Sequence, residues 1–202
     1  MKLGNFTGDA EFLRAKSRSS YTENRYNVVQ YKNFFSKKMH KEKQKILFLS
    51  KRGTLRAPLA SEVFKKLISK TKYNDLIEVF YRGSSKVYDN CHVDYRINYY
   101  HQITGVGVFG KSKFANAEDF ERSDYIITLD ENSMNFAKLF RVRGYIYPFT
   151  FFRPSRSSEF ISDPYEDTDD IDAHYRSIIS SIEAGCKRIV RSLIPILAYD
   201  HK

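Results

Sequence analysis

The 202-residue sequence has no tryptophan and only two cysteines. Cys91 and Cys186 are too few for a disulfide framework and lack the spacing of metal ligands. Scarce cysteine is typical of a reducing compartment, so we expect a cytoplasmic protein. Because the ligand spacing is absent, we also expect no metal, and we expect no other cofactor. The longest apolar stretches, such as Leu193–Tyr199, are too short to cross a bilayer, and the first residues lack the apolar segment of a secretory signal. We therefore expect no transmembrane segment.

Positive charge is abundant and unevenly distributed. The net charge is +10, and residues 1–44 contain ten Lys/Arg against four Asp/Glu, which places six of the ten net charges there. We predict that 1–44 is a basic N-terminal extension, with helical pieces near Ala10–Lys16 and Tyr26–Phe35, preceding a domain at 45–202. Such an extension can contact an acidic partner, nucleic acid or an anionic membrane surface. It can equally be a solvated surface, because it matches no nucleic-acid-binding motif.

From residue 45 the pattern becomes that of an α/β domain. Short apolar runs predict four strands, at Ile46–Leu49, Ile77–Tyr81, Tyr125–Leu129 and Gly144–Pro148. The first is apolar throughout, as in a strand buried on both faces. Helical periodicity follows the first strand and returns in a final helix from about Asp170 to Leu193. This alternation predicts a four-stranded, mostly parallel sheet with helices on both faces.

A candidate anion-binding loop, Ser50–Arg56, joins the first strand to the first helix. Amides at a helix N-terminus point outward unpaired, and a curled loop there forms a nest for an oxyanion. Gly53 allows the positive φ of such a curl, and the Arg56 guanidinium matches two phosphate oxygens. The Walker pattern of nucleotide-binding loops is absent. We expect the phosphate-binding residues to be Lys51, Arg52, Gly53, Thr54, Leu55 and Arg56.

Several motifs in order resemble the low-molecular-weight protein tyrosine phosphatase family. The loop lies in the run KILFLSKRGTLRAPLASEVFKKL, which is similar to the family's amino-terminal signature of Cys, five residues, Arg, Ser or Thr, and Pro. Further similar segments are Tyr81–Ser84, Asp94 with Arg96, His101–Val106, the run AEDFERSDYIITLDENSMNFAKL, Asp163-Pro164-Tyr165 and Ile182–Cys186. The resemblance covers roughly Lys45 to Tyr199 and implies the family's fold.

The resemblance also implies catalytic roles. It places Ser50 at the nucleophile position, Arg56 as the oxyanion clamp and Asp163 as the general acid, with Tyr165 as a wall of the substrate pocket. Two departures stand out: Ser50 replaces the family's cysteine, and Ala57 replaces a hydroxyl-bearing residue. A serine hydroxyl is a far weaker acid than a thiol, so the thiolate mechanism is lost.

These features support three alternative functions. The first is a catalytically impaired homologue, a pseudophosphatase, that binds a phosphorylated protein or a small oxyanion. The second is an active tyrosine phosphatase in which Ser50 is an engineered exchange for cysteine, which the natural coding sequence would reveal. The third is a nucleic-acid or membrane-surface binder that uses residues 1–44. Whether the chain is an enzyme therefore stays open at this point.

Overall fold

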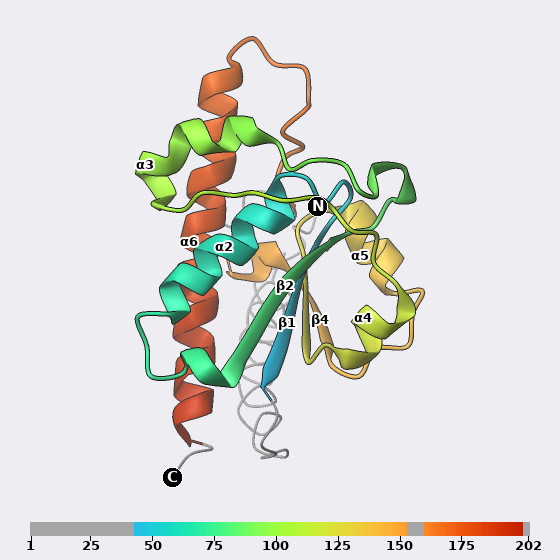
Figure 1. Cartoon of the computed structure of the whole chain (residues 1–202), viewed down its shortest axis with the longest axis vertical. Coiled ribbons are helices and arrows are strands. Elements are labelled where there is room, and N and C mark those ends of the chain that lie inside the picture. Colours follow the sequence, from blue (N-terminus) through green and yellow to red (C-terminus); the bar gives the residue numbers. More distant parts are fainter. Residues whose placement is uncertain (1–42, 153–159, 200–202) are drawn as a thin grey trace, which may run out of the picture. The chain divides into compact units, whose positions relative to one another are not determined.

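The computed structural model describes residues 43–152 and 160–199, with side chains as far as Ser192. The fold and the site lie within one compact unit, Glu42–Ile194 (Figure 1). The helices expected near Ala10–Lys16 and Tyr26–Phe35, and almost all of the basic extension 1–44, lie outside the described residues.

The four predicted strands are present and form one parallel sheet with the order β2-β1-β3-β4. Their bounds are β1 Gln44–Ser50, β2 Ile77–Gly83, β3 Tyr125–Thr128 and β4 Tyr145–Pro148. Each begins or ends within two residues of its predicted limits. The four-stranded α/β fold class predicted from the sequence is confirmed.

Helices connect the strands and complete the chain. The α-helices are α2 Arg56–Ile68, α3 His101–Thr104, α4 Ala117–Arg122, α5 Glu131–Ala137 and α6 Ile171–Tyr199, and the 3-10 helices are η2 Asn74–Leu76, η3 Lys86–Tyr88, η4 Tyr95–Tyr100 and η5 Phe149–Phe152. Among the described residues, no helix combines the length and the apolarity that a membrane span needs. The final helix confirms a prediction, and it extends further than the periodicity indicated.

Helices α2 and α6 lie together on one face of the sheet (Figure 1). The Phe48 ring of β1 packs against Phe64 of α2, with 5.8 Å between ring centroids. Helix α6 is in contact with α2: the Cys186 thiol of α6 donates a hydrogen bond of 3.5 Å to the carbonyl of Ala60 in α2. Burial of these apolar side chains stabilises the layer by about 25 cal/mol per Å².

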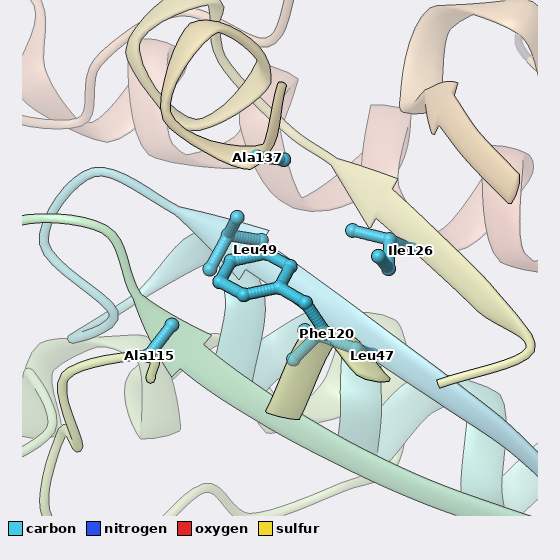
Figure 2. Close-up of a cluster of buried hydrophobic side chains, with 6 residues drawn as sticks. All are labelled: Leu47, Leu49, Ala115, Phe120, Ile126 and Ala137. Atoms are coloured by element: carbon cyan, nitrogen blue, oxygen red, sulfur yellow. The ribbon is translucent and has the colours of Figure 1, made fainter. Parts of the chain in front are cut away.

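Helices α4 and α5 cover the opposite face (Figure 2). Leu47 and Leu49, which alternate with Phe48 along β1, point into a buried cluster completed by Ala115, Phe120, Ile126 and Ala137. Alternation sends successive side chains of a strand to opposite faces, so β1 is buried on both sides, as its unbroken apolar run predicts.

Parallel strands bring the segments that follow them to one edge of the sheet. The register pairs Ser50 with Gly83 and Leu49 with Thr128. The Ser84 amide donates to the Ser50 carbonyl at 3.0 Å, which ties the end of β2 to the start of the loop. Ligands of open α/β sheets bind beyond these carboxyl ends, and the predicted anion-binding loop lies there.

Candidate functional site

The loop between β1 and α2 is curled around Gly53. Residues 51–55 form a run of bends, and Gly53 has φ +67°. A Cβ atom at this position would lie 2.4 Å from Ser112 Oγ and 2.7 Å from the Gly83 amide nitrogen. Ser112 Oγ in turn donates to the Arg52 carbonyl at 2.8 Å. Glycine is therefore required both by the left-handed backbone and by the closeness of β2.

The curl leaves most of the loop amides without an internal acceptor. The Lys51 amide donates to Asp130 Oδ2 at 2.8 Å, and the Gly53 amide donates to Ser50 Oγ at 3.2 Å. Within the described part of the chain, no acceptor is found for the amides of Arg52, Thr54, Leu55 and Arg56. Four N–H donors at the N-terminal end of α2 are thus available to an oxyanion.

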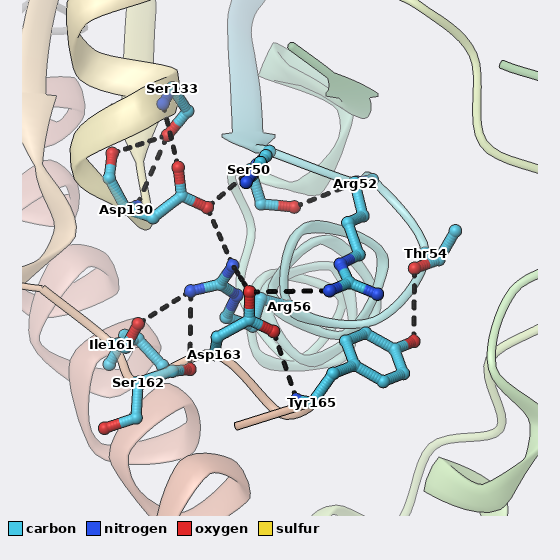
Figure 3. Close-up of polar contacts among 12 residues, drawn as sticks. Ser50, Arg52, Thr54, Arg56, Asp130, Ser133, Ile161, Ser162, Asp163 and Tyr165 are labelled. Atoms are coloured by element: carbon cyan, nitrogen blue, oxygen red, sulfur yellow. Dashed lines mark hydrogen bonds and ion pairs between the residues drawn. The ribbon is translucent and has the colours of Figure 1, made fainter. Parts of the chain in front are cut away.

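Arg56 is buried and firmly held, with 4% of its surface exposed. Its Nη2 lies 2.9 Å from Asp130 Oδ2, and Nη1 donates to the carbonyls of Ile161 and Ser162 at 2.7 and 3.3 Å (Figure 3). These contacts use three of the five N–H groups of a guanidinium. The Nε–H and one Nη2–H have no acceptor among the described residues, so Arg56 is oriented and still has donors for a ligand.

Asp130 holds both Arg56 and the first loop amide. It is the N-cap of α5: Oδ1 accepts from the Ser133 amide at 2.8 Å, while Ser133 Oγ approaches the Asp130 amide at 3.3 Å. This capping box leaves Oδ2 free to face the loop. The sequence did not identify this role. The available signal was that Asp130 follows a buried strand at the edge where Ser50 lies.

Asp163 lies beside the loop, as the resemblance implies. Its Oδ2 is 4.0 Å from Arg56 Nη2 and 3.9 Å from Arg52 Nη2. Its Oδ1 accepts from the Tyr165 amide at 3.1 Å, and its carbonyl contacts His174 Nε2 of α6 at 2.8 Å. The segment that carries this carboxylate is therefore anchored to α6.

Tyr165 joins this segment to the loop. Its hydroxyl lies 3.3 Å from Thr54 Oγ1 and donates to Asp94 Oδ2 at 3.0 Å. Burial raises the pKa of Tyr165, so the phenol stays protonated and able to donate. The structure thus brings together Ser50–Arg56, Asp163 and Tyr165, which the sequence had grouped only by resemblance.

Asp94 anchors Tyr165, and the sequence did not identify this function. Asp94 Oδ2 also accepts from the Tyr175 hydroxyl at 3.1 Å and from Arg96 Nη2 at 2.6 Å. Its amide donates to the Thr54 carbonyl at 2.8 Å. Burial acts to raise the pKa of Asp94, but hydrogen bonds from Arg96 and Tyr165 more than offset this and hold the pKa below its ordinary value.

Ser50 has no activating neighbour within the described part of the chain. Its side chain is buried, and among the described residues its Oγ makes a hydrogen bond only with the Gly53 amide. No carboxylate or imidazole of the described chain is hydrogen-bonded to it, and Ala57 nearby is buried and apolar. An alcohol needs an adjacent general base to become a nucleophile.

The two cysteines lie outside the Ser50–Arg56 loop. Both cysteines are free thiols, Cys91 exposed and Cys186 buried on α6, where burial raises the pKa of the Cys186 thiol. Across residues 43–152 and 160–199, no three His, Cys, Asp or Glu side chains cluster as metal ligands.

Comparison with known protein families finds one that matches most of this chain. The family model for low molecular weight phosphotyrosine protein phosphatase matches residues 45–195. No curated protein matches the chain by sequence.

Solved structures match the chain's fold over most of its length. A protein tyrosine phosphatase from Entamoeba histolytica matches at 20% identity and TM-score 0.66, covering 75% of this chain and 97% of that one. A low molecular weight phosphotyrosine phosphatase from Vibrio cholerae matches at 17% identity and TM-score 0.64, covering 74% and 96%. A Drosophila arginine phosphatase matches at 21% identity and TM-score 0.62, covering 73% and 96%. At such identities these structures support the fold alone.

Proposed function

Because the chain belongs to the low molecular weight phosphotyrosine protein phosphatase family, we propose that it binds a phosphorylated ligand at the Ser50–Arg56 loop and hydrolyses it slowly or not at all. The ligand is a phosphorylated protein or a small oxyanion. Arg56 and the unpaired loop amides hold the phosphate oxygens, and Asp163 lies beside the leaving group.

One observation supports this proposal above the others: four loop amides have no acceptor among the described residues, while the hydroxyl at the nucleophile position has no base among them. A thiol in this positive environment would be deprotonated, whereas an alcohol would not. In the Entamoeba histolytica relative, Hepes occupies the active site. Hepes carries a sulfonate, which is a tetrahedral oxyanion, and this is in line with the role proposed for the Ser50–Arg56 loop.

The experiment separates binding from turnover. Calorimetric titration measures the affinity for inorganic phosphate, and an assay with phenyl phosphate measures the rate of hydrolysis. Both are applied to four proteins: the unaltered protein, Arg56→Lys, Ser50→Cys and the double variant Ser50→Cys/Ala57→Ser. We expect the unaltered protein to bind phosphate and Arg56→Lys to bind it about tenfold more weakly, because lysine lacks the bidentate fork. The double variant is expected to gain turnover of on the order of 10³-fold or more.

Two outcomes would contradict the proposal. Hydrolysis by the unaltered protein at the rate of Ser50→Cys would show that the serine is an effective nucleophile. Absence of phosphate binding to the folded protein would show that the loop is not an anion seat. A cysteine codon at position 50 of the natural gene would instead make the parent protein an active phosphatase, which is the second alternative drawn from the sequence.

Two finer predictions accompany this function. A cytoplasmic location is supported by two free thiols. An acidic partner for residues 1–44 is supported only by their charge, since the segment lies outside the described residues except at its end.

A further inference from the structure

Arg52 lies against the ring of Tyr165, which the resemblance implies is a wall of the substrate pocket. Its Cζ is 4.1 Å from the centroid of the Tyr165 ring and 5.1 Å from that of Tyr88, the last residue of η3. Figure 3 shows the guanidinium lying along the Tyr165 ring at the loop. Cation–π attraction of this kind is strongest over the face of a ring. Arg52 therefore already covers the surface on which a flat ligand ring would stack.

The guanidinium of Arg52 also has donors to spare. Its Nε is buried and has no hydrogen-bond partner within the described chain. Among the described residues, its Nη2 forms an ion pair with the Asp163 carboxylate alone, at 3.9 Å, which is beyond hydrogen-bonding distance. Arg96 provides the contrast: it also lies over the Tyr165 ring, but its Nε and Nη2 both donate hydrogen bonds to the Asp94 carboxylate. Aromatic contact thus holds Arg52 in position without using up its N–H groups.

Arg52 is close enough to Arg56 for one small ligand to reach both. A nitrogen of each guanidinium lies within 4.0 Å of the same Asp163 oxygen, so the two nitrogens are separated by no more than the sum of those two distances. A phosphate held by Arg56 would have its ester substituent next to Arg52. There, the Nη groups of Arg52, which make no hydrogen bond among the described residues, would donate to a carboxylate or a second phosphate, whereas a phenyl ring would have to displace the arginine.

We infer that Arg52 determines specificity, and that the site takes phosphate monoesters bearing a second anionic group near the phosphate in preference to aryl phosphates. This inference rests on the proposed phosphate seat, and it narrows the ligand class of that seat. It identifies the ligand by its chemistry: two negative groups within the span of Arg52 and Arg56.

Calorimetric titration with four probes tests the inference on the full chain. The probes are inorganic phosphate, ethyl phosphate, phosphoglycolate and phenyl phosphate, of which phosphoglycolate differs from ethyl phosphate by a carboxylate. For the unaltered protein we expect phosphoglycolate to bind about tenfold more tightly than ethyl phosphate, and phenyl phosphate to bind no more tightly than ethyl phosphate. In Arg52→Leu, the advantage of phosphoglycolate should vanish and phenyl phosphate should gain about tenfold.

Two further variants separate shape from charge. Arg52→Lys keeps the charge but not the flat guanidinium, so phosphoglycolate should keep part of its advantage; this variant also serves if Arg52→Leu does not fold. Lys51→Gln removes a charge from the neighbouring position. It should weaken ethyl phosphate and phenyl phosphate alike, so that their ratio is unchanged, and weaken phosphoglycolate somewhat more, because Coulomb attraction grows with the charge of the ligand and not with its shape.

The outcomes also distinguish this inference from the proposed function. If inorganic phosphate binds but the unaltered protein prefers phenyl phosphate to phosphoglycolate, or if Arg52→Leu leaves their ratio unchanged, the inference is wrong and the phosphate seat stands. If no probe binds the folded protein, both are wrong.

Discussion

Gly53 shapes the loop through its backbone. Replacing it has two energetic costs: strain at a positive φ, and crowding of the new side chain against β2. Alanine at a positive φ costs roughly 1–2 kcal/mol for the conformation alone. At Gly53 the added Cβ would also meet the backbone of Gly83. We expect Gly53→Ala to lower the free energy of unfolding by at least about 3 kcal/mol and to abolish phosphate binding. Urea denaturation and phosphate titration measure the two effects.

Gly105 provides the matched control for this substitution. Its φ of +63° is close to that of Gly53, but the atoms nearest to an added Cβ are the flexible tip of Lys66. Gly105→Ala should therefore cost little more than the conformational part and leave phosphate binding intact. An equal loss of stability in both variants would show that crowding against β2 does not constrain the loop.

Asp94 links three elements, because it contacts the loop through Thr54, the Asp163 segment through Tyr165, and α6 through Tyr175. Replacing Asp94 by asparagine removes a charged acceptor shared by two hydroxyl groups. We expect Asp94→Asn to lower the free energy of unfolding at pH 7 by about 2 kcal/mol. Asp172→Asn is the control: Asp172 also bonds a tyrosine and an arginine, but it is exposed, so little change is expected.

The same variant has a pH dependence whose sign follows from the lowered pKa of Asp94. Because the folded-state pKa lies below the ordinary value of about 3.9, the stabilisation is complete only above about pH 5, where the unfolded-state carboxyl is also ionised. It is lost as the pH falls through the folded-state pKa. The difference in unfolding free energy between the unaltered protein and Asp94→Asn should therefore shrink from pH 5 to pH 3. A difference that stays constant would exclude Asp94 as the titrating group.

Elements were predictable where local pattern decides them. The unbroken apolar run of β1 and the periodicity of α6 were sufficient, whereas α4 and α5, with six and seven residues, are too short to show a period. The strand-loop-helix order located the curled loop at Ser50–Arg56, whose anion binding stays a prediction. It could not show Asp130 and Asp94, because their contacts with Lys51 and Tyr165 join residues 79 and 71 positions apart. Such pairs are set by how the elements pack, which residue order alone does not specify.

At the scale of the whole molecule, the main feature is the uneven distribution of positive charge along the chain. Six of the ten net positive charges fall in residues 1–44. If this segment binds a polyanion such as DNA, affinity should fall steeply with salt. Replacing Lys37, Lys38 and Lys41 by glutamine should then flatten the plot of log K against log salt by about 0.9 per lysine in contact. Lys187→Gln, an exposed site on α6, serves as the control. Identical slopes for all variants would rule out the basic extension as a polyanion binder.

The two carbonyls that hold Arg56 have a thermodynamic consequence. Ile161 and Ser162 precede Asp163, so the residue that would clamp the anion is hydrogen-bonded to the segment that carries the acid. Any macromolecule that pulls this segment from the loop would release Arg56 and weaken the hold on phosphate. By reciprocity, bound phosphate would oppose that macromolecule by the same factor. Phosphate in the loop would then change the affinity of any macromolecule that binds residues 160–165, although that macromolecule need not touch the phosphate.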